Sequence, residues 1–127
     1  MLRPIMIVDD SEDTRELFTA ALEAEGFSVV AAKSGEEALS LLGERDDFSL
    51  ILLDLSMPGM TGVEMLEEME RRNVGRGVPV MLVSAADNLR SIRTPGNVID
   101  TLKKPFFYPE LIFKIREQHR LGPSGPI

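Results

Sequence analysis

The chain has 127 residues, the usual size of a single compact domain. It contains no Cys and one His, which excludes disulfide frameworks and thiolate nucleophiles and disfavours a zinc site or a histidine-based catalytic triad. The formal net charge of −7 disfavours a DNA-binding surface, and no apolar run approaches the roughly 20 residues of a membrane span. The first residues lead into a strand-like segment without a signal peptide's apolar region, so we expect a cytoplasmic protein.

The first part of the chain alternates between short apolar runs and segments with helical periodicity. Ile5 to Val8 is apolar throughout and predicts a strand. Asp10 or Ser11 can cap the helix that follows, and Gly26 supplies the left-handed residue that commonly ends a helix. Phe27 to Ala32 then predicts a second strand.

The middle of the chain repeats this alternation. Ser34 is followed three residues later by Glu37, a capping-box pattern that predicts the start of a second helix. Leu50 to Leu53 is again apolar throughout and predicts a strand that ends at Asp54. Another helix is expected from near Thr61 to about residue 73.

The last part of the chain contains two further predicted strands and a final helix. Val78 to Val83 is the fourth strand and is closed by Ser84. The stretch from Ala85 to Asn97 has the weakest pattern, and Val98 to Leu102 is a short fifth strand. Pro109 fits the first turn of the last helix.

Strands that are apolar on both faces and alternate with helices predict an α/β fold. We expect a doubly wound, five-stranded parallel sheet of the flavodoxin-like order 2-1-3-4-5, with helices on both faces. This domain should span residues 1–121, and residues 122–127, which contain Gly and Pro, should form a flexible tail or a truncated linker. Ligands in such folds bind outside the carboxyl ends of the strands, so these ends are where a site is expected.

Polar side chains stand at the carboxyl ends of four predicted strands. Asp9 and Asp10 follow the first strand, Asp54 the third, Ser84 the fourth and Lys104 the fifth. Neighbouring carboxylates repel one another unless a cation is present, and oxygen ligands of this kind suit Mg²⁺. A carboxylate nucleophile, a divalent metal, a mobile positive charge and a hydroxyl donor together suit transfer of a phosphoryl group to an aspartate.

The sequence resembles the receiver domain of two-component response regulators over about residues 5–120. The resemblance rests on four segments in this order: Ile7 to Asp10, Leu52 to Gly62, Val83 to Ala85 and Leu102 to Phe106. It implies a phosphoacceptor switch that receives a phosphoryl group from a histidine kinase or a phosphotransfer protein and then changes its binding to a downstream protein. Such a domain is a signalling module and not a turnover enzyme, since it assists only its own phosphorylation and dephosphorylation.

The resemblance also implies the roles of individual residues around a bound cation. Asp54 would be the phosphoacceptor. Asp10, Asp54 and the backbone carbonyl of Ser56 would hold Mg²⁺ or Mn²⁺, and Asp9 would act mainly through water.

Two further residues would contact the phosphoryl group itself. By the same resemblance, Ser84 would donate a hydrogen bond to one phosphoryl oxygen and Lys104 would contact another. The Lys104–Pro105 peptide bond would often be cis in this family, which fits the weak trans preference before proline.

The region expected to change conformation departs from the family pattern. Receivers commonly carry an aromatic residue three positions before the lysine, where this chain has Thr101, so the usual aromatic switch is absent or altered. The loop from Ala85 to Asn97 is our candidate for the element that responds to phosphorylation. Ala85 and Ala86 are small, and water should therefore reach the acyl phosphate readily.

Other interpretations of the same residues remain open. Asp9 and Asp10 could only cap a helix, and Asp54 could only cap a turn, but four such coincidences at one sheet edge are improbable. A receiver-like module that binds its partner independently of phosphorylation is the main alternative function. A phosphohydrolase of the haloacid dehalogenase type is disfavoured. Those enzymes have two aspartates with one residue between them, whereas Asp9 and Asp10 are consecutive here. We expect no direct nucleic-acid binding or membrane insertion, and homodimerisation stays undecided.

The small residues after Ser84 predict a short-lived phosphorylated form. We expect the adduct, once formed, to hydrolyse well within hours in buffer containing Mg²⁺, as measured by intact mass at successive times. An adduct that persists for many hours in that buffer would contradict this prediction.

Overall fold

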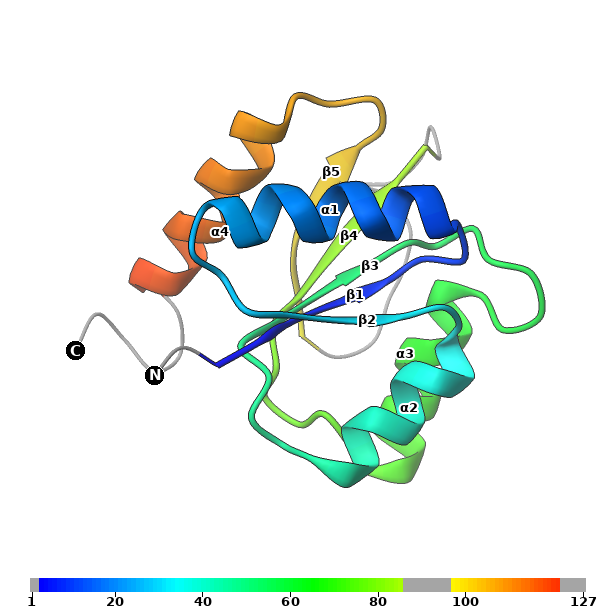
Figure 1. Ribbon diagram of the computed structural model, residues 1–127. Helices are drawn as coiled ribbons and strands as arrows, with labels where there is room; N and C mark the ends of the chain where they lie inside the picture. Colours follow the sequence, from blue (N-terminus) through cyan, green and yellow to red (C-terminus); the bar gives the residue numbers. More distant parts are fainter. Residues whose placement is uncertain (1–2, 86–96, 122–127) are drawn as a thin grey trace.

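Five parallel strands form one sheet in the order β2-β1-β3-β4-β5 in the computed structural model, which describes residues 3–85 and 97–121, with side chains through residue 118 (Figure 1). The strands are β1 (Ile5–Val8), β2 (Val29–Ala32), β3 (Leu50–Leu53), β4 (Val80–Ser84) and β5 (Val98–Lys103). The helices are α1 (Glu12–Ala24), α2 (Gly35–Glu44), α3 (Gly62–Arg72) and α4 (Tyr108–Leu121). The predicted fold class and strand order are confirmed.

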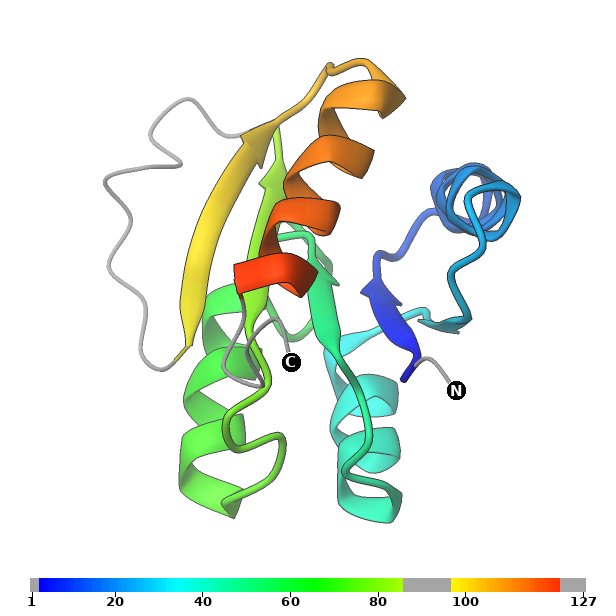
Figure 2. The ribbon, with the colours of Figure 1, turned by 90° about the vertical axis from the view of Figure 1, so that its left-hand side faces the viewer.

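Helices cover both faces of the sheet, with α1 and α4 on one side and α2 and α3 on the other (Figures 1 and 2). Alternate residues of each strand point to opposite faces. In β1, Ile5 and Ile7 belong to the core under α1 and α4, whereas Met6 and Val8 belong to the core under α2 and α3. This arrangement explains why β1, β3 and β4 are apolar at nearly every position: neither face of these strands meets water.

Hydroxyl caps set the starts of three helices, and the caps of the first two were predicted. The capping box predicted for Ser34 is incomplete, because the Glu37 side chain accepts from the Lys33 N–H. The hydroxyl of Ser11 accepts a hydrogen bond from the Thr14 N–H at the start of α1, and Ser34 and Thr61 do the same for α2 and α3. Thr61 takes part in a complete capping box with Glu64. Ser11, rather than Asp10, is therefore the N-cap of α1, which leaves the Asp10 carboxylate available to the site.

Two predicted strand starts were too early by two residues. The strand expected from Phe27 begins at Val29, because the Phe27 N–H donates to the Leu22 carbonyl (3.0 Å) in the turn that closes α1. The strand expected from Val78 begins at Val80, because the Val78 N–H donates to Gly75 and Pro79 has no N–H to offer a neighbouring strand.

Several further expectations concern segments outside the described residues. These are the structure of residues 86–96, which include Ala86, and the proposed tail over residues 122–127. Within the described ranges, no helix is both long enough and apolar enough to span a membrane.

The capping box of α3 generates a stability prediction. Thr61→Ala should lower the free energy of unfolding by about 1 kcal/mol, because the Glu64 N–H loses its partner at the helix start. Ser40→Ala removes an exposed hydroxyl inside α2 and should leave stability unchanged or slightly higher. Urea denaturation of the two variants measures the difference, and equal stability of the pair would contradict the capping role.

Candidate functional site

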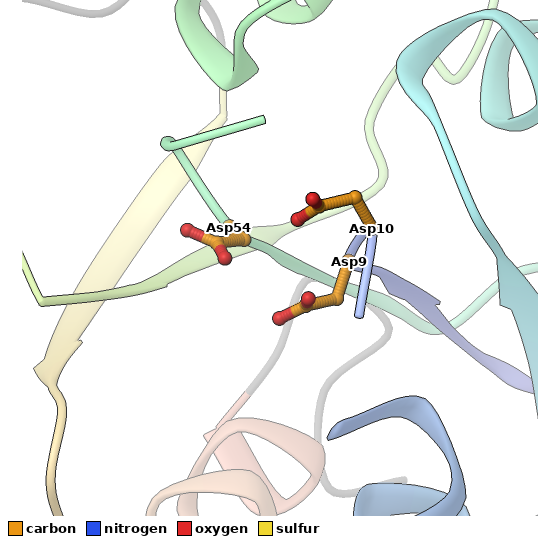
Figure 3. A group of neighbouring side chains, drawn as sticks. All are labelled: Asp9, Asp10 and Asp54. Atoms are coloured by element: carbon orange, nitrogen blue, oxygen red, sulfur yellow. The ribbon is translucent and has the colours of Figure 1, made fainter. Parts of the chain in front are cut away.

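Three carboxylates converge at the carboxyl ends of β1 and β3. Asp9, Asp10 and Asp54 each offer an oxygen atom, and these atoms all lie within 4.8 Å of one another (Figure 3). Asp9 and Asp54 are buried, with 4% and 8% of their surface exposed, and Asp10 is exposed. The cluster is thus buried on the side of Asp9 and Asp54 and open to solvent on the side of Asp10, as a site for a small charged ligand requires.

The register of the central strands brings these residues together. Val8 and Leu53 are paired residues at the ends of β1 and β3, so the aspartates that follow them lie side by side. The Asp54 N–H donates to the Val8 carbonyl at 3.0 Å, which continues the β1–β3 hydrogen bonding into the site. The sheet order also reverses at this point, because β2 lies on one side of β1 and β3 on the other.

Backbone N–H groups hold two of the carboxylates in place. The Ser11 N–H donates to Asp9 Oδ1 at 2.9 Å, and the Ser56 N–H donates to Asp54 Oδ1 at 3.0 Å. Each carboxylate therefore bonds the backbone two residues ahead and folds it into a tight turn. Each keeps its second oxygen, Oδ2, for other partners.

Lys104 supplies the positive charge at the site. Its ammonium lies 3.1 Å from Asp9 Oδ2 and 3.4 Å from Asp54 Oδ2. Its backbone N–H donates to the Ser84 carbonyl at 2.9 Å, and its peptide bond to Pro105 is cis, as expected. One lysine at the end of β5 thus partly neutralises two aspartates carried by β1 and β3.

Burial and hydrogen-bonded neighbours act in opposite directions on the pKa of the Asp54 carboxyl. Burial, the largest effect, raises the pKa of Asp54, and the negative charge of Asp9 adds to this. The Ser56 N–H and the charge of Lys104 lower the pKa of Asp54 but do not cancel the increase. The ionised carboxylate is therefore poorly compensated and would gain from a further cation.

The pKa of Lys104 is raised as well, which for a lysine favours the charged form. Burial alone would lower the pKa of Lys104, but its hydrogen bond to Asp9 and the charge of Asp54 raise it overall. Lys104 therefore stays charged across the physiological pH range.

The other predicted site residues lie around this cluster. Ser84 is fully buried at the end of β4, between β3 and β5. Ser56 and Ala85 are exposed. Thr101 is half-buried in β5 opposite Leu82, and its N–H donates to Asp100 Oδ1 at 2.7 Å.

Two features of the site were not found from the sequence. Arg15 of α1 donates from Nη1 to the Asp9 carbonyl at 2.8 Å and so ties the helix to the end of β1. Phe18, Phe106 and Tyr108 form three edge-to-face ring contacts with centroids 5.6–5.7 Å apart, which fasten the chain after Lys104 to α1. The sequence gives no sign that these three rings meet, because Phe18 is far from Phe106 and Tyr108 along the chain.

The chemistry of the donor set fits Mg²⁺. All the side-chain donors are carboxylate oxygens, and within the described residues no His lies in the cluster. Magnesium prefers oxygen ligands and keeps several waters, which an open site with one exposed carboxylate can accommodate. The three carboxylates still exceed the positive charges of Lys104 and of Arg15 at the Asp9 carbonyl, and this excess favours binding of a divalent cation.

Comparison with known proteins agrees with this geometry. The family described as "Response regulator receiver domain" matches residues 5–116. The chain is 39% identical over 114 residues to the transcriptional regulatory protein CpxR homolog of Haemophilus influenzae, covering 88% of this chain and 48% of that protein. It is 32% identical over 130 residues to the phosphate regulon transcriptional regulatory protein PhoB of Escherichia coli, covering 98% and 56%.

Solved structures show the same fold. The response regulator TrrA from Thermotoga maritima, determined in complex with Mg²⁺-BeF, superimposes with a TM-score of 0.80 at 29% identity, covering 91% of this chain and 98% of that one. The receiver domain of NtrX from Brucella abortus gives a TM-score of 0.78 at 27% identity, covering 93% and 99%.

The fold and the aspartate cluster define a receiver domain. This chain belongs to the response regulator receiver family of two-component systems. It spans about half the length of the CpxR homolog and of PhoB.

The raised pKa of Asp54 generates a prediction about pH and stability. Because the folded-state pKa lies above the unfolded value, ionising this carboxyl destabilises the fold as the pH rises through that range. In EDTA, Asp54→Asn should therefore be more stable than the parent at pH 7, and the difference should shrink as the pH falls through the raised pKa and be absent below about pH 4.

Asp47, whose pKa is lowered rather than raised, provides the control. The hydrogen bond from Arg45 lowers the pKa of Asp47, so Asp47→Asn should be slightly less stable than the parent at pH 7. This difference should also shrink on acidification. Urea denaturation at the two pH values measures both pairs, and a loss of stability at pH 7 in Asp54→Asn would contradict the expected direction of the effect.

Proposed function

We propose that this domain is a phosphoacceptor switch in which Asp54 accepts a phosphoryl group from the phosphohistidine of a kinase or phosphotransfer protein. The observation that carries the proposal is the convergence of Asp9, Asp10 and Asp54 with Lys104 at one sheet edge. The structure of the similar TrrA protein with Mg²⁺-BeF adds support, because a receiver of the same fold takes up this pair of ligands.

The proposed chemistry uses Asp54 as the nucleophile. An oxygen of its carboxylate forms a bond to phosphorus while the bond from phosphorus to the donor's imidazole nitrogen breaks, and the imidazole leaves with the bonding electrons. Oδ1 is already engaged by the Ser56 N–H, whereas Oδ2 faces Lys104. We therefore assign Oδ2 as the attacking atom.

The remaining residues stabilise the transferred group. Lys104 can move from the carboxylates to a phosphoryl oxygen, because its contact with Asp54 Oδ2 is the longer of its two at 3.4 Å. Ser84 is positioned at the end of the strand next to β3 and would donate its hydroxyl to another oxygen. A bound Mg²⁺, held by Asp10, Asp54 and the Ser56 carbonyl and by Asp9 through water, would neutralise the developing negative charge.

The route from phosphorylation to a partner would differ from that of receivers with an aromatic residue at the position of Thr101. Thr101 has no ring to move, and its N–H is held by Asp100, which in turn pairs with Lys114 of α4 at 3.0 Å. We propose that Lys104, on leaving the aspartates, changes the end of β5 and that a protein partner recognises this change.

The experiment that tests the function is phosphorylation by a small donor. Incubation with acetyl phosphate and Mg²⁺ should add one phosphoryl group by intact mass, and Asp54→Asn or EDTA should abolish the adduct. Absence of any adduct in a rapidly quenched reaction of the parent protein would contradict the proposal and favour a module that works without phosphate.

Lys104→Ala provides a graded test of the phosphoryl contacts. Removal of one preorganised positive donor should slow labelling by acetyl phosphate by about 100-fold. Lys103→Ala, a change at the neighbouring exposed lysine, is the matched control and should label at nearly the parental rate. Equal rates for the two variants would contradict the role of Lys104.

A further inference from the structure

Gly62, the first residue of α3, lies against the backbone of the acceptor segment. A Cβ atom built at this position would lie 2.7 Å from the Asp54 carbonyl oxygen and 2.8 Å from Leu55 Cα. Real Cβ atoms essentially never approach other atoms this closely. A third atom, Leu55 Cδ2, would lie at 2.9 Å, but the two nearest atoms belong to the backbone, so a rotamer change cannot relieve the contact.

The acceptor segment is therefore held from two sides. On the sheet side, the Asp54 N–H bonds the Val8 carbonyl at 3.0 Å. On the α3 side, the Gly62 N–H donates to the Leu55 carbonyl at 3.1 Å, and the capping box at Thr61 fixes the first turn of the helix. The chain from Asp54 to Ser56 has little freedom between these supports.

We propose that Gly62 is a positioning residue of the acceptor site. Its missing side chain lets α3 rest directly on the Asp54 and Leu55 backbone, and this contact sets where the Asp54 carboxylate and the Ser56 carbonyl point. The inference rests on the proposed function, because it gives Gly62 a role in placing the acceptor and the cation ligands.

Among residues 3–85 and 97–121, no other glycine lies this close to the backbone of another segment. The Cβ of Gly35 would meet mainly the thioether of Met60, the end of a flexible side chain, and a Cβ at Gly43 would meet nothing within 4 Å. Gly62 lies in α3 and does not have a positive φ, so its own backbone conformation is open to any residue. Glycine at this position is required by the close approach of another backbone and not by its own φ.

The test compares Gly62→Ala with two control variants in the full chain. Gly43→Ala makes the same change in a helix without a contact. Ile115→Val removes a methylene from the buried core under α4 and provides a variant that loses stability at a remote place. Mg²⁺ affinity is measured by calorimetry and labelling by acetyl phosphate at saturating Mg²⁺, below the melting range of every variant.

A displacement of a few tenths of an ångström at the acceptor should affect both measurements. We expect Gly62→Ala to weaken Mg²⁺ binding about tenfold and to slow saturated labelling about tenfold or more. Gly43→Ala and Ile115→Val should stay within about twofold of the parent. Parental values for Gly62→Ala, or equal losses in Ile115→Val, would overturn the proposal.

A second variant covers the case in which Gly62→Ala does not fold. Thr61→Ala keeps Gly62 but loosens the turn behind the acceptor, and should weaken Mg²⁺ binding about threefold, which is more than in either control. Binding within the range of the controls would overturn the proposal. If the parent binds Mg²⁺ but is not labelled, the proposed function fails while the Mg²⁺ comparison still decides the role of Gly62. A parent protein that binds no Mg²⁺ would overturn both.

Discussion

Repulsion among three carboxylates at the ends of β1 and β3 is the constraint on which the rest of the site depends. Two of them are buried, and burial raises the pKa of Asp54 despite hydrogen bonds and a nearby lysine. Backbone N–H groups hold one oxygen of Asp9 and one of Asp54, and Lys104 bridges the other two. The site is therefore assembled but short of positive charge, which favours binding of a divalent cation.

Every layer of the fold contributes to this arrangement. The central strands bring the aspartates together, β4 and β5 add Ser84 and Lys104, and α1 and α3 brace the loops that follow the strands. Under the proposed function, Lys104 is the residue best placed to respond to phosphorylation, because a phosphoryl group beside Asp54 Oδ2 would change its contacts to Asp9 and Asp54. The proposed route from the site runs through β5 to α4, which Asp100 and Lys114 link, and needs no aromatic residue at the position of Thr101.

The sequence was informative wherever a residue's own chemistry decides the local structure. Hydroxyl caps such as Ser34 and the apolar run that ends at Asp54 located the helices, the strands and the aspartate cluster. The starts of β2 and β4 were wrong because turn hydrogen bonds at Phe27 and Val78 compete with the sheet. The contacts of Arg15, Phe18 and Gly62 could not be predicted, since each depends on the close approach of segments that are apart in the sequence.

The most direct test of the central claim is the effect of Mg²⁺ on the free energy of unfolding at constant ionic strength. A cation that binds only the folded carboxylate cluster should stabilise the parent by about 2.7 kcal/mol when its concentration is 100 times its dissociation constant. Asp10→Asn, which removes the exposed carboxylate of the cluster, should lose most of this effect. No stabilisation of the parent, or equal stabilisation of Asp10→Asn, would contradict the claim that these three aspartates form a cation site.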